Sequence, residues 1–192
     1  MHHIHHTTAY VLSHRNSGEA DRIFRLFVRD IGVISAKATG IRKQSSKLRF
    51  ALQEGSYVTI DLVRGKDIWR VTSASPQKGL ALLIGESQKM FVRALKLIKR
   101  LAGGETAHEL VFDDLDAFFE TLYKEQLTDE TLLAGEALFV LRVLHHLGYW
   151  GDDERFLKYS SGLFVRGLLD EMVQDRKKIV PMINESLRAT HL

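Results

Sequence analysis

The sequence predicts an α+β fold, in which a small five-stranded β-barrel precedes an all-helical domain. Three observations carry this prediction. Between residues 8 and 74, apolar and polar residues alternate with a period of two, which is typical of half-buried strands. After residue 79 the apolar period becomes that of an amphipathic helix. Basic charge is also concentrated at one end: residues 1–79 carry 13 Lys and Arg against 6 Asp and Glu, whereas residues 80–192 carry 14 against 18.

The N-terminal part divides into a tail and five strands. The segment MHHIHH leads us to expect a disordered, His-rich tail over residues 1–7. Strand-like segments follow at residues 8–15, 22–29, 32–41, 56–65 and 66–74. Their alternation places three sets of side chains on the inner face: Phe24, Leu26 and Val28; Ile34, Ala36 and Ala38; Val58, Ile60 and Leu62. The oligonucleotide-binding (OB) fold is a common five-stranded barrel, so we predict an OB-fold nucleic-acid-binding domain over residues 8–76.

The segment SASPQKG (residues 73–79) is the expected boundary, and the helical domain is predicted over residues 80–192. Helical patterns cover residues 86–104, 113–126 and 128–149, with one or two further helices in residues 160–192. Their expected buried positions are Phe91, Ala94, Leu95, Ile98 and Leu101 in the first pattern, and Leu115, Phe118, Phe119 and Leu122 in the second. Thr128 is the expected N-cap of the third.

The sequence offers no residues for catalysis. It lacks a Walker-type loop, a G-x-S-x-G motif and an H-E-x-x-H motif. Without Cys it has no disulfide, no thiolate nucleophile and no Cys-based metal site. It also lacks an apolar run long enough to cross a membrane and the pattern of a secretory signal. We therefore expect a non-enzymatic cytoplasmic protein with no metal and no cofactor.

Cations concentrate where a barrel could present them to phosphate. The segment GIRKQSSKLRF (residues 40–50) forms the expected long link between the third and fourth strands, with Ser46 as a turn former and Leu48 as a core plug. The candidate DNA-binding residues are Arg15, Arg22, Arg25, Lys37, Arg42, Lys43, Lys47, Arg49 and Arg64. Arg70 is a further cation of this half. Phe27, Tyr57 and Trp69 are interleaved with these cations; each is first expected in the barrel core, and base stacking is the alternative. Single-strand binders combine these residue types, cations for phosphates and aromatic faces for bases.

Two other functions fit the same composition. An RNA-binding barrel differs from a DNA-binding one only in the preferred polymer. A protein-interaction adaptor would use the barrel for a protein partner, and its basic charge would then be incidental.

The order of motifs over residues 9–65 resembles the N-terminal domain of the RecO family of bacterial DNA repair and recombination mediators. The matching features are a G-E-x-D-R turn (Gly18, Glu19, Asp21, Arg22), a D-x-G turn (Asp30, Gly32), and KATGIRK followed by Ser46, Lys47 and Leu48. Further on, an apolar helix ends in L-x-x-L-G-Y (Leu144, Leu147, Gly148, Tyr149), as in that family.

The resemblance implies binding of single- and double-stranded DNA, strand annealing, and recombinase loading with RecR and single-strand-binding protein. It also implies a bacterial cytoplasmic, nucleoid-associated protein. Many members carry a four-Cys zinc insert after the L-G-Y helix. Here WGDDERFLKYSSGLF stands in that place, and the chain resembles a short, zinc-less variant of the family.

Arg142 lies inside the apolar segment ALFVLRVLHHL, where an unpaired charge would be costly. One interpretation is an Arg that reaches the surface or pairs with an internal carboxylate such as Glu136. The other is a partner-binding residue, whose guanidinium holds the carboxylate of the acidic, aromatic C-terminal tail of single-strand-binding protein.

Overall fold

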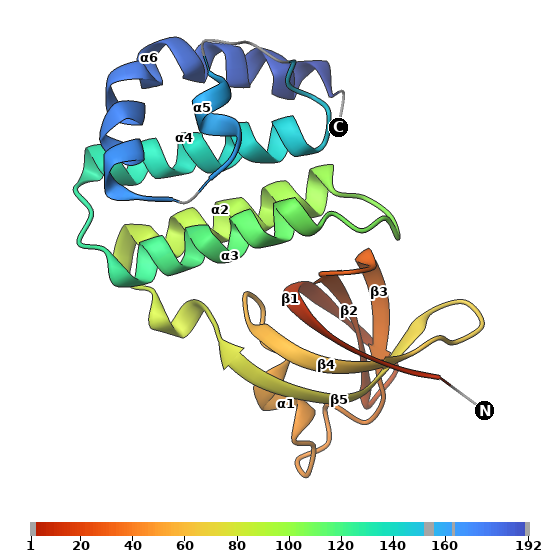
Figure 1. The fold of residues 1–192 in the computed structure, drawn as a ribbon. Helices are drawn as coiled ribbons and strands as arrows, with labels where there is room; N and C mark the ends of the chain where they lie inside the picture. The colour runs from red at the N-terminus through yellow and green to blue at the C-terminus, as the bar shows by residue number, and fades with distance from the viewer. Residues whose placement is uncertain (1–2, 152–155, 163, 191–192) are drawn as a thin grey trace. The chain divides into compact units, whose positions relative to one another are not determined.

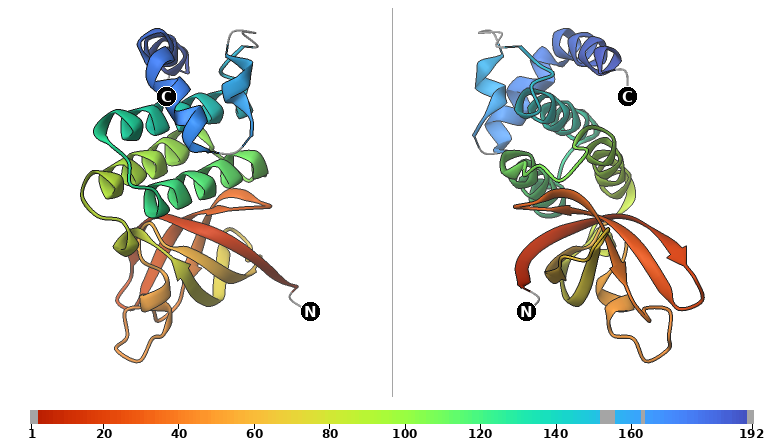
Figure 2. Two further views of the ribbon diagram at one scale, coloured as in Figure 1. Left: turned by 60° about the vertical axis from the view of Figure 1, so that its left-hand side comes forward. Right: turned by 90° about the vertical axis from the view of Figure 1, so that its right-hand side faces the viewer.

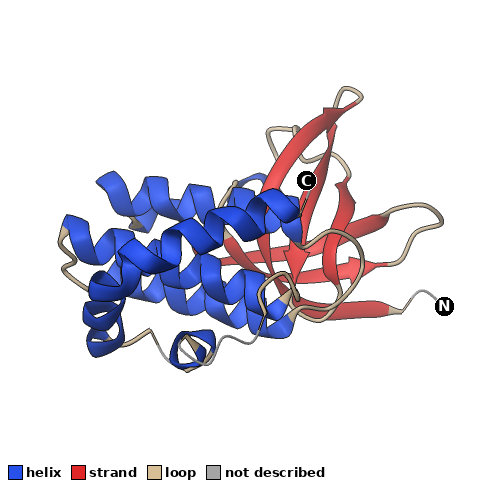
Figure 3. Cartoon of the chain, turned by 90° about the horizontal axis from the view of Figure 1, so that it is seen from above, coloured by secondary structure: helices blue, strands red, loops and turns tan. Residues whose placement is uncertain are grey.

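The computed structural model describes residues 3–151, 156–162 and 164–190, and the chain divides into two compact units. The strand unit comprises Met1–Ile84 with Ala102–Ala107, and the helical unit comprises Gly85–Leu101 with His108–Leu192. The long helices all belong to the helical unit, and the strands all belong to the strand unit (Figure 3). The α+β class with helices after strands is therefore confirmed.

Five strands form the strand unit: β1 (Ile4–Ser17), β2 (Asp21–Val28), β3 (Gly32–Ala38), β4 (Tyr57–Val63) and β5 (Trp69–Lys78). Hydrogen-bonded neighbours follow the order β1-β2-β3-β5-β4, and β1 also pairs with β4, so the strands form a closed ring (Figure 1). The β3–β5 pair is parallel and the other pairs are antiparallel. This arrangement is OB-fold-like, as predicted.

The interior of the ring confirms the period-two pattern. All nine predicted inner residues of β2, β3 and β4 belong to one buried cluster. Ala9 and Val11 of β1 join it, and so do Ile41 and Leu52 from the link between β3 and β4. The alternation was a reliable signal because successive side chains of a strand point to opposite faces.

The expectation of a disordered tail through residue 7 is wrong. β1 begins at Ile4, which pairs with Val63, and pairing with β4 continues without interruption to Tyr10. The His side chains take part: His5 Nε2 lies 2.7 Å from Asp30 Oδ2, and His6 Nδ1 lies 2.6 Å from Asp61 Oδ1. The His-rich composition did not reveal the strand, because its partners come from elsewhere in the chain. Residues 1 and 2 lie outside the described residues.

The expected boundary, residues 73–79, lies within β5 over most of its length, because β5 continues to Lys78, and the strand unit runs on to Ile84. Pro76 sits opposite Val58, beside an irregularity in the β4–β5 register. A proline is tolerated there because the regular ladder of N–H donors is already interrupted. The change of structure follows in η1 (Leu80–Leu82).

The link between β3 and β4 contains α1 (Leu48–Ala51), a single helical turn (Figure 1). Leu48 packs against the buried cluster of the ring, as expected of a core plug. The amide N–H of Ser46 donates to the Lys43 carbonyl at 3.0 Å, as expected of a turn former.

The helical unit contains α2 (Gly85–Leu101), α3 (Glu109–Lys124), α4 (Asp129–His146), α5 (Leu157–Ser160) and α6 (Arg166–Ala189). Helices α2, α3 and α4 lie side by side, and α6 packs along α4 (Figures 1 and 2). The predicted buried positions of α2 and α3 are confirmed. Helix α3 begins at Glu109, four residues before the start of the predicted helical pattern at residue 113. Thr128 caps α4 as predicted, since its side chain accepts the Thr131 N–H.

Candidate nucleic-acid interface

Arg25 lies on the outer face of β2. It alternates with Phe24 and Leu26, which are fully buried inside the ring, so its side chain points outward. Arg25 Nη1 donates to Ser35 Oγ on β3 at 3.3 Å. OB folds use the face of strands 2 and 3 to bind oligonucleotides. Arg25 therefore occupies a place where phosphate contact is expected.

A row of paired positions crosses the same face. Arg15 on β1 stands opposite Ile23 on β2, and Ile23 stands opposite Lys37 on β3. Lys37 in turn pairs in register with Arg70 on β5. Residues paired in register share a face of the sheet, so three cations from three strands lie in one row.

Asp21, at the start of β2, offsets part of this charge. Its carboxylate accepts the Gly40 N–H at 2.8 Å and lies 2.9 Å from Lys37 Nζ. The Gly40 N–H and the Lys37 ammonium hold the pKa of Asp21 below its ordinary value of 3.8. Gly40 has a φ of +68°, which favours glycine, so the same carboxylate also fixes the start of the link. The Asp21 carboxylate therefore offsets part of the charge of Lys37.

The link presents Arg42, Lys43 and Lys47 as exposed cations. Two hydrogen bonds hold Arg42 in place: its N–H donates to the Ala20 carbonyl at 2.9 Å, and its Nη1 donates to the Gly18 carbonyl at 3.1 Å. Within the described part of the chain, none of the three cations forms an ion pair. Their charge is therefore available to a polyanion, on a backbone that hydrogen bonds hold in place.

Three predicted guanidinium groups meet around one pocket. Its volume is about 430 Å³, and it is lined by Arg22, Ile41, Arg42, Arg49, Phe50 and Gln53. We call it the arginine pocket. Arg22 shares the side of β2 that carries Phe24, and its Nε donates to Asn16 Oδ1 at 3.3 Å. The fold thus gathers three guanidinium groups that are far apart in the sequence, and guanidinium groups are the donors that recognise phosphate and carboxylate in proteins.

Phe50 is the aromatic residue of this pocket, and it was not among the predicted site residues. Leu48 and Ala51 of α1 face the ring interior or are buried, whereas Phe50 is 68% exposed. The Arg49 guanidinium carbon lies 4.7 Å from the centre of the Phe50 ring, within cation–π distance. The sequence does contain an indication of this site. If residues 48, 51 and 52 face the core, an aromatic residue at position 50 points away from it.

The three aromatic platforms expected from the sequence are less suitable. Phe27 is fully buried, as first expected, so it cannot stack on a base. Tyr57 packs against Tyr10 with ring centres 5.0 Å apart. Trp69 is half-buried against the ring core, and its Nε1 donates to Glu105 Oε1 at 3.3 Å.

Arg64 lies apart from the arginine pocket in a cluster with Trp69 and Glu105. Its Nη1 forms an ion pair with Glu105, and its guanidinium carbon lies 5.0 Å from the Trp69 ring centre. The Glu105 carboxylate offsets the charge of Arg64. Of the nine predicted cations, Arg64 and Lys37 are the two with a carboxylate partner among the described residues.

The partner-binding role predicted for Arg142 is wrong. Its side chain has no exposed surface. Its Nη1 lies 3.0 Å from Asp114 Oδ1, and the guanidinium also donates to the carbonyls of Tyr159, Ser161 and Gly162 at 2.7–2.9 Å. It therefore fastens the α5 segment to α4 and α3 and is inaccessible to a peptide carboxylate.

The internal carboxylate that Arg142 finds is Asp114 rather than Glu136, which pairs with Arg93 at 2.5 Å. Asp114 Oδ2 also lies 3.0 Å from His146 Nε2. Burial raises the pKa of Asp114 and lowers the pKa of His146, because both charged forms lose hydration. Arg142 opposes the rise at Asp114. The cluster is a buried polar connection between helices.

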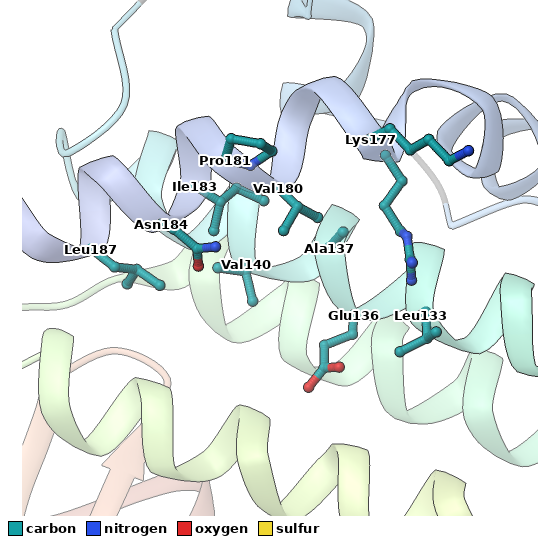
Figure 4. A pocket seen from close by; sticks show the side chains of 11 residues that line it. Leu133, Glu136, Ala137, Val140, Lys177, Val180, Pro181, Ile183, Asn184 and Leu187 are labelled. Carbon is teal, nitrogen blue, oxygen red and sulfur yellow. The ribbon is translucent and has the colours of Figure 1, made fainter.

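A second pocket, of about 500 Å³, lies between α4 and α6 in the helical unit. Figure 4 shows the side chains around it, which are mostly apolar: Leu133, Ala137, Val140, Val180, Pro181, Ile183 and Leu187, with Glu136, Arg176, Lys177 and Asn184. We call it the α4–α6 groove. Leu133, 40% exposed, leaves apolar surface open to solvent.

The described residues contain neither a metal-binding cluster nor a membrane-spanning helix. Among residues 3–151, 156–162 and 164–190, no three His, Asp or Glu side chains gather closely enough to hold a metal ion. In the same part of the chain, no helix combines the length and the apolar character needed to cross a membrane.

Comparison with known proteins gives matches to RecO proteins, both by family model and by individual relatives. Residues 1–79 match the family model described as "Recombination protein O N terminal". The chain is 36% identical over 149 residues to the DNA repair protein RecO of Heliobacterium modesticaldum, covering 73% of this chain and 50% of that protein. It is 30% identical over 149 residues to the protein of the same name from Desulfitobacterium hafniense, covering 76% and 52%. The chain spans about half the length of these curated relatives.

Proposed function

Because this chain belongs to the RecO family, we propose that it is a DNA-binding mediator in DNA repair and recombination, which acts by binding rather than by catalysis. It binds single- and double-stranded DNA, promotes annealing of complementary strands, and helps to load recombinase together with RecR and single-strand-binding protein. The arginine pocket is the observation that carries the proposal, because it joins three guanidinium groups and an exposed aromatic ring on an OB-fold-like unit.

The mechanism is electrostatic. Guanidinium and ammonium groups of the strand unit neutralise phosphates and release the counterions that surround them. The arginine pocket and the row of Arg15, Lys37 and Arg70 supply cations in two places on this unit. Cations in two places can lower the repulsion between two strands that approach each other. Annealing follows from this neutralisation and needs no covalent step.

Salt-dependent binding tests the proposal. We expect the affinity of the chain for a single-stranded DNA oligomer to fall linearly in a plot of log K against log salt concentration. Fluorescence anisotropy with labelled single-stranded DNA, duplex DNA and RNA oligomers measures this, and annealing of complementary oligomers is followed in parallel. Preferential binding of RNA would instead support the RNA-binding alternative. Absence of binding to any oligomer at low salt, with capture of a protein partner, would support the adaptor alternative.

We propose that the tail of single-strand-binding protein binds in the α4–α6 groove, because the buried Arg142 is inaccessible to it and the lining of the groove suits its chemistry. Apolar side chains of the groove suit an aromatic residue of the tail, and Arg176 and Lys177 suit its acidic residues. We expect the double variant Arg176→Ala/Lys177→Ala to bind a tail peptide about tenfold more weakly, the loss of about one charged hydrogen bond.

Isothermal titration with the peptide measures that loss. Lys124→Ala/Lys178→Ala is the matched control, because it also removes two positive charges from exposed side chains and neither residue lines the groove. Equal affinity of the double variant and wild type would remove the groove from the proposal.

A further inference from the structure

We propose that the arginine pocket holds one unpaired nucleotide of single-stranded DNA, with its base stacked on Phe50 and its phosphate on Arg22 and Arg42. This inference rests on the proposed DNA-binding function and adds a selectivity to it. The other cations of the strand unit contact any DNA backbone, whereas this pocket distinguishes single strands from duplex.

The shape and lining of the pocket carry the first step. Its volume of about 430 Å³ lies within the range of about 300–1,000 Å³ that is usual for small-molecule sites. A nucleotide offers two chemistries, a flat aromatic face and an anion. Phe50 supplies an aromatic face, and the guanidinium groups of Arg22 and Arg42 supply planar donors for phosphate oxygens.

The exposure of Phe50 carries the second step. A single exposed apolar residue is ordinary on a protein surface. Phe50 differs because it is 68% exposed, it lines the pocket, and its neighbours Ala51 and Leu52 are almost fully buried. The burial of these neighbours anchors α1, so the ring is held out on a fixed helical turn. Arg49 lies over the ring at 4.7 Å and reinforces that orientation.

The fixed position of Arg42 carries the third step. Its hydrogen bonds to Ala20 and Gly18 tie the link to the turn between β1 and β2. Arg22, the second residue of β2, directly follows that turn, and its Nε donates to Asn16 Oδ1 of β1. The phosphate ligands and the stacking ring therefore belong to one hydrogen-bonded rim, which lowers the entropic cost of binding.

Selectivity follows from base stacking. In a duplex both faces of each base are already stacked, so a base reaches Phe50 only after it has been extruded. The phosphate contacts remain possible with either form of DNA. Phe50 should accordingly contribute to single-strand affinity and leave duplex affinity nearly unchanged. An annealing protein with this property holds its substrates more firmly than its product.

The test compares Phe50→Leu and Phe50→Trp in the full chain. We expect Phe50→Leu to weaken binding of an unstructured single-stranded DNA oligomer about 5- to 150-fold, the range expected for one base–aromatic contact. Its affinity for duplex of the same length should stay within about twofold of wild type. Phe50→Trp should retain single-strand binding, because it preserves an aromatic face. Leu keeps an apolar side chain, so folding is little affected, and urea unfolding verifies this.

An oligomer in which abasic sites replace the bases supplies a second readout. Wild type and Phe50→Leu should bind it equally, since no base remains to stack. If Phe50→Leu bound the intact single strand as tightly as wild type did, the pocket would not hold a base, although the proposed function would stand. If wild type bound no oligomer at low salt, the proposed function would fail, and the inference with it.

Discussion

The variant with Arg22, Arg42 and Arg49 all replaced by alanine is expected to bind single-stranded DNA about a hundredfold more weakly than wild type near 0.1 M salt. Each lost phosphate contact, here those of Arg22 and Arg42, reduces the slope of log K against log salt by about 0.7, so the slope should become shallower by about 1.4. The three residues line one pocket, and none has a carboxylate partner among the described residues. Anisotropy titrations at several salt concentrations measure both quantities.

A variant with the same loss of charge is the control for that result. Lys124, Arg166 and Lys178 lie on helices of the helical unit with exposed side chains, and changing all three to alanine also removes three positive charges. Only a small loss of affinity is expected, from the lower net charge. Equal losses in both variants would mean that net charge, and not the pocket, governs binding. Urea unfolding of each variant separates a binding effect from a folding effect.

Arg142→Ala is expected to lower the free energy of unfolding by about 3–5 kcal/mol, the usual cost of breaking a buried ion pair by removing one partner. The substitution would leave the buried Asp114 carboxylate without its guanidinium, and the carbonyls of Tyr159, Ser161 and Gly162 without that donor. It would also leave a cavity where a large, fully buried side chain stood. Urea denaturation followed by circular dichroism measures the change.

Arg93→Ala provides the comparison, because it also breaks ion pairs, to Glu136 and Glu86, but on an exposed face. We expect it to change stability by less than about 1 kcal/mol. If Arg142→Ala unfolded like wild type and lost affinity only for the tail peptide, the buried role would be refuted. The interpretation of Arg142 as a partner-binding residue would then be restored.

Local chemistry was enough to predict the fold class. The period-two alternation in β2, β3 and β4 specified which side chains face inward, because strand geometry fixes that relation within one segment. The helical period did the same for α2 and α3. Thr128 was recognisable as a cap because the N–H that it accepts lies three residues away. The family resemblance depended on turn residues with fixed short spacings, and it too was visible in the sequence.

Local chemistry did not predict which residues pair with each other across the fold. The strand that begins at Ile4 exists because β4, about 60 residues later in the chain, pairs with it. Arg142 pairs with Asp114, which is 28 residues away in the sequence. Glu136 is nearer to Arg142 in the sequence, but it pairs with Arg93. The acceptor of a buried donor is decided by distance in space, and a sequence does not contain that distance.

The sequence by itself determined the basic charge of the N-terminal half, the strand and helix content, and the cations that could meet DNA. Only the tertiary structure decided which of those cations lie together. It paired Lys37 and Arg64 with carboxylates, gathered Arg22, Arg42 and Arg49 around one pocket, and left Phe50 exposed beside them. The physical reason is that charge is a property of a residue, whereas a binding site is a property of distances between residues.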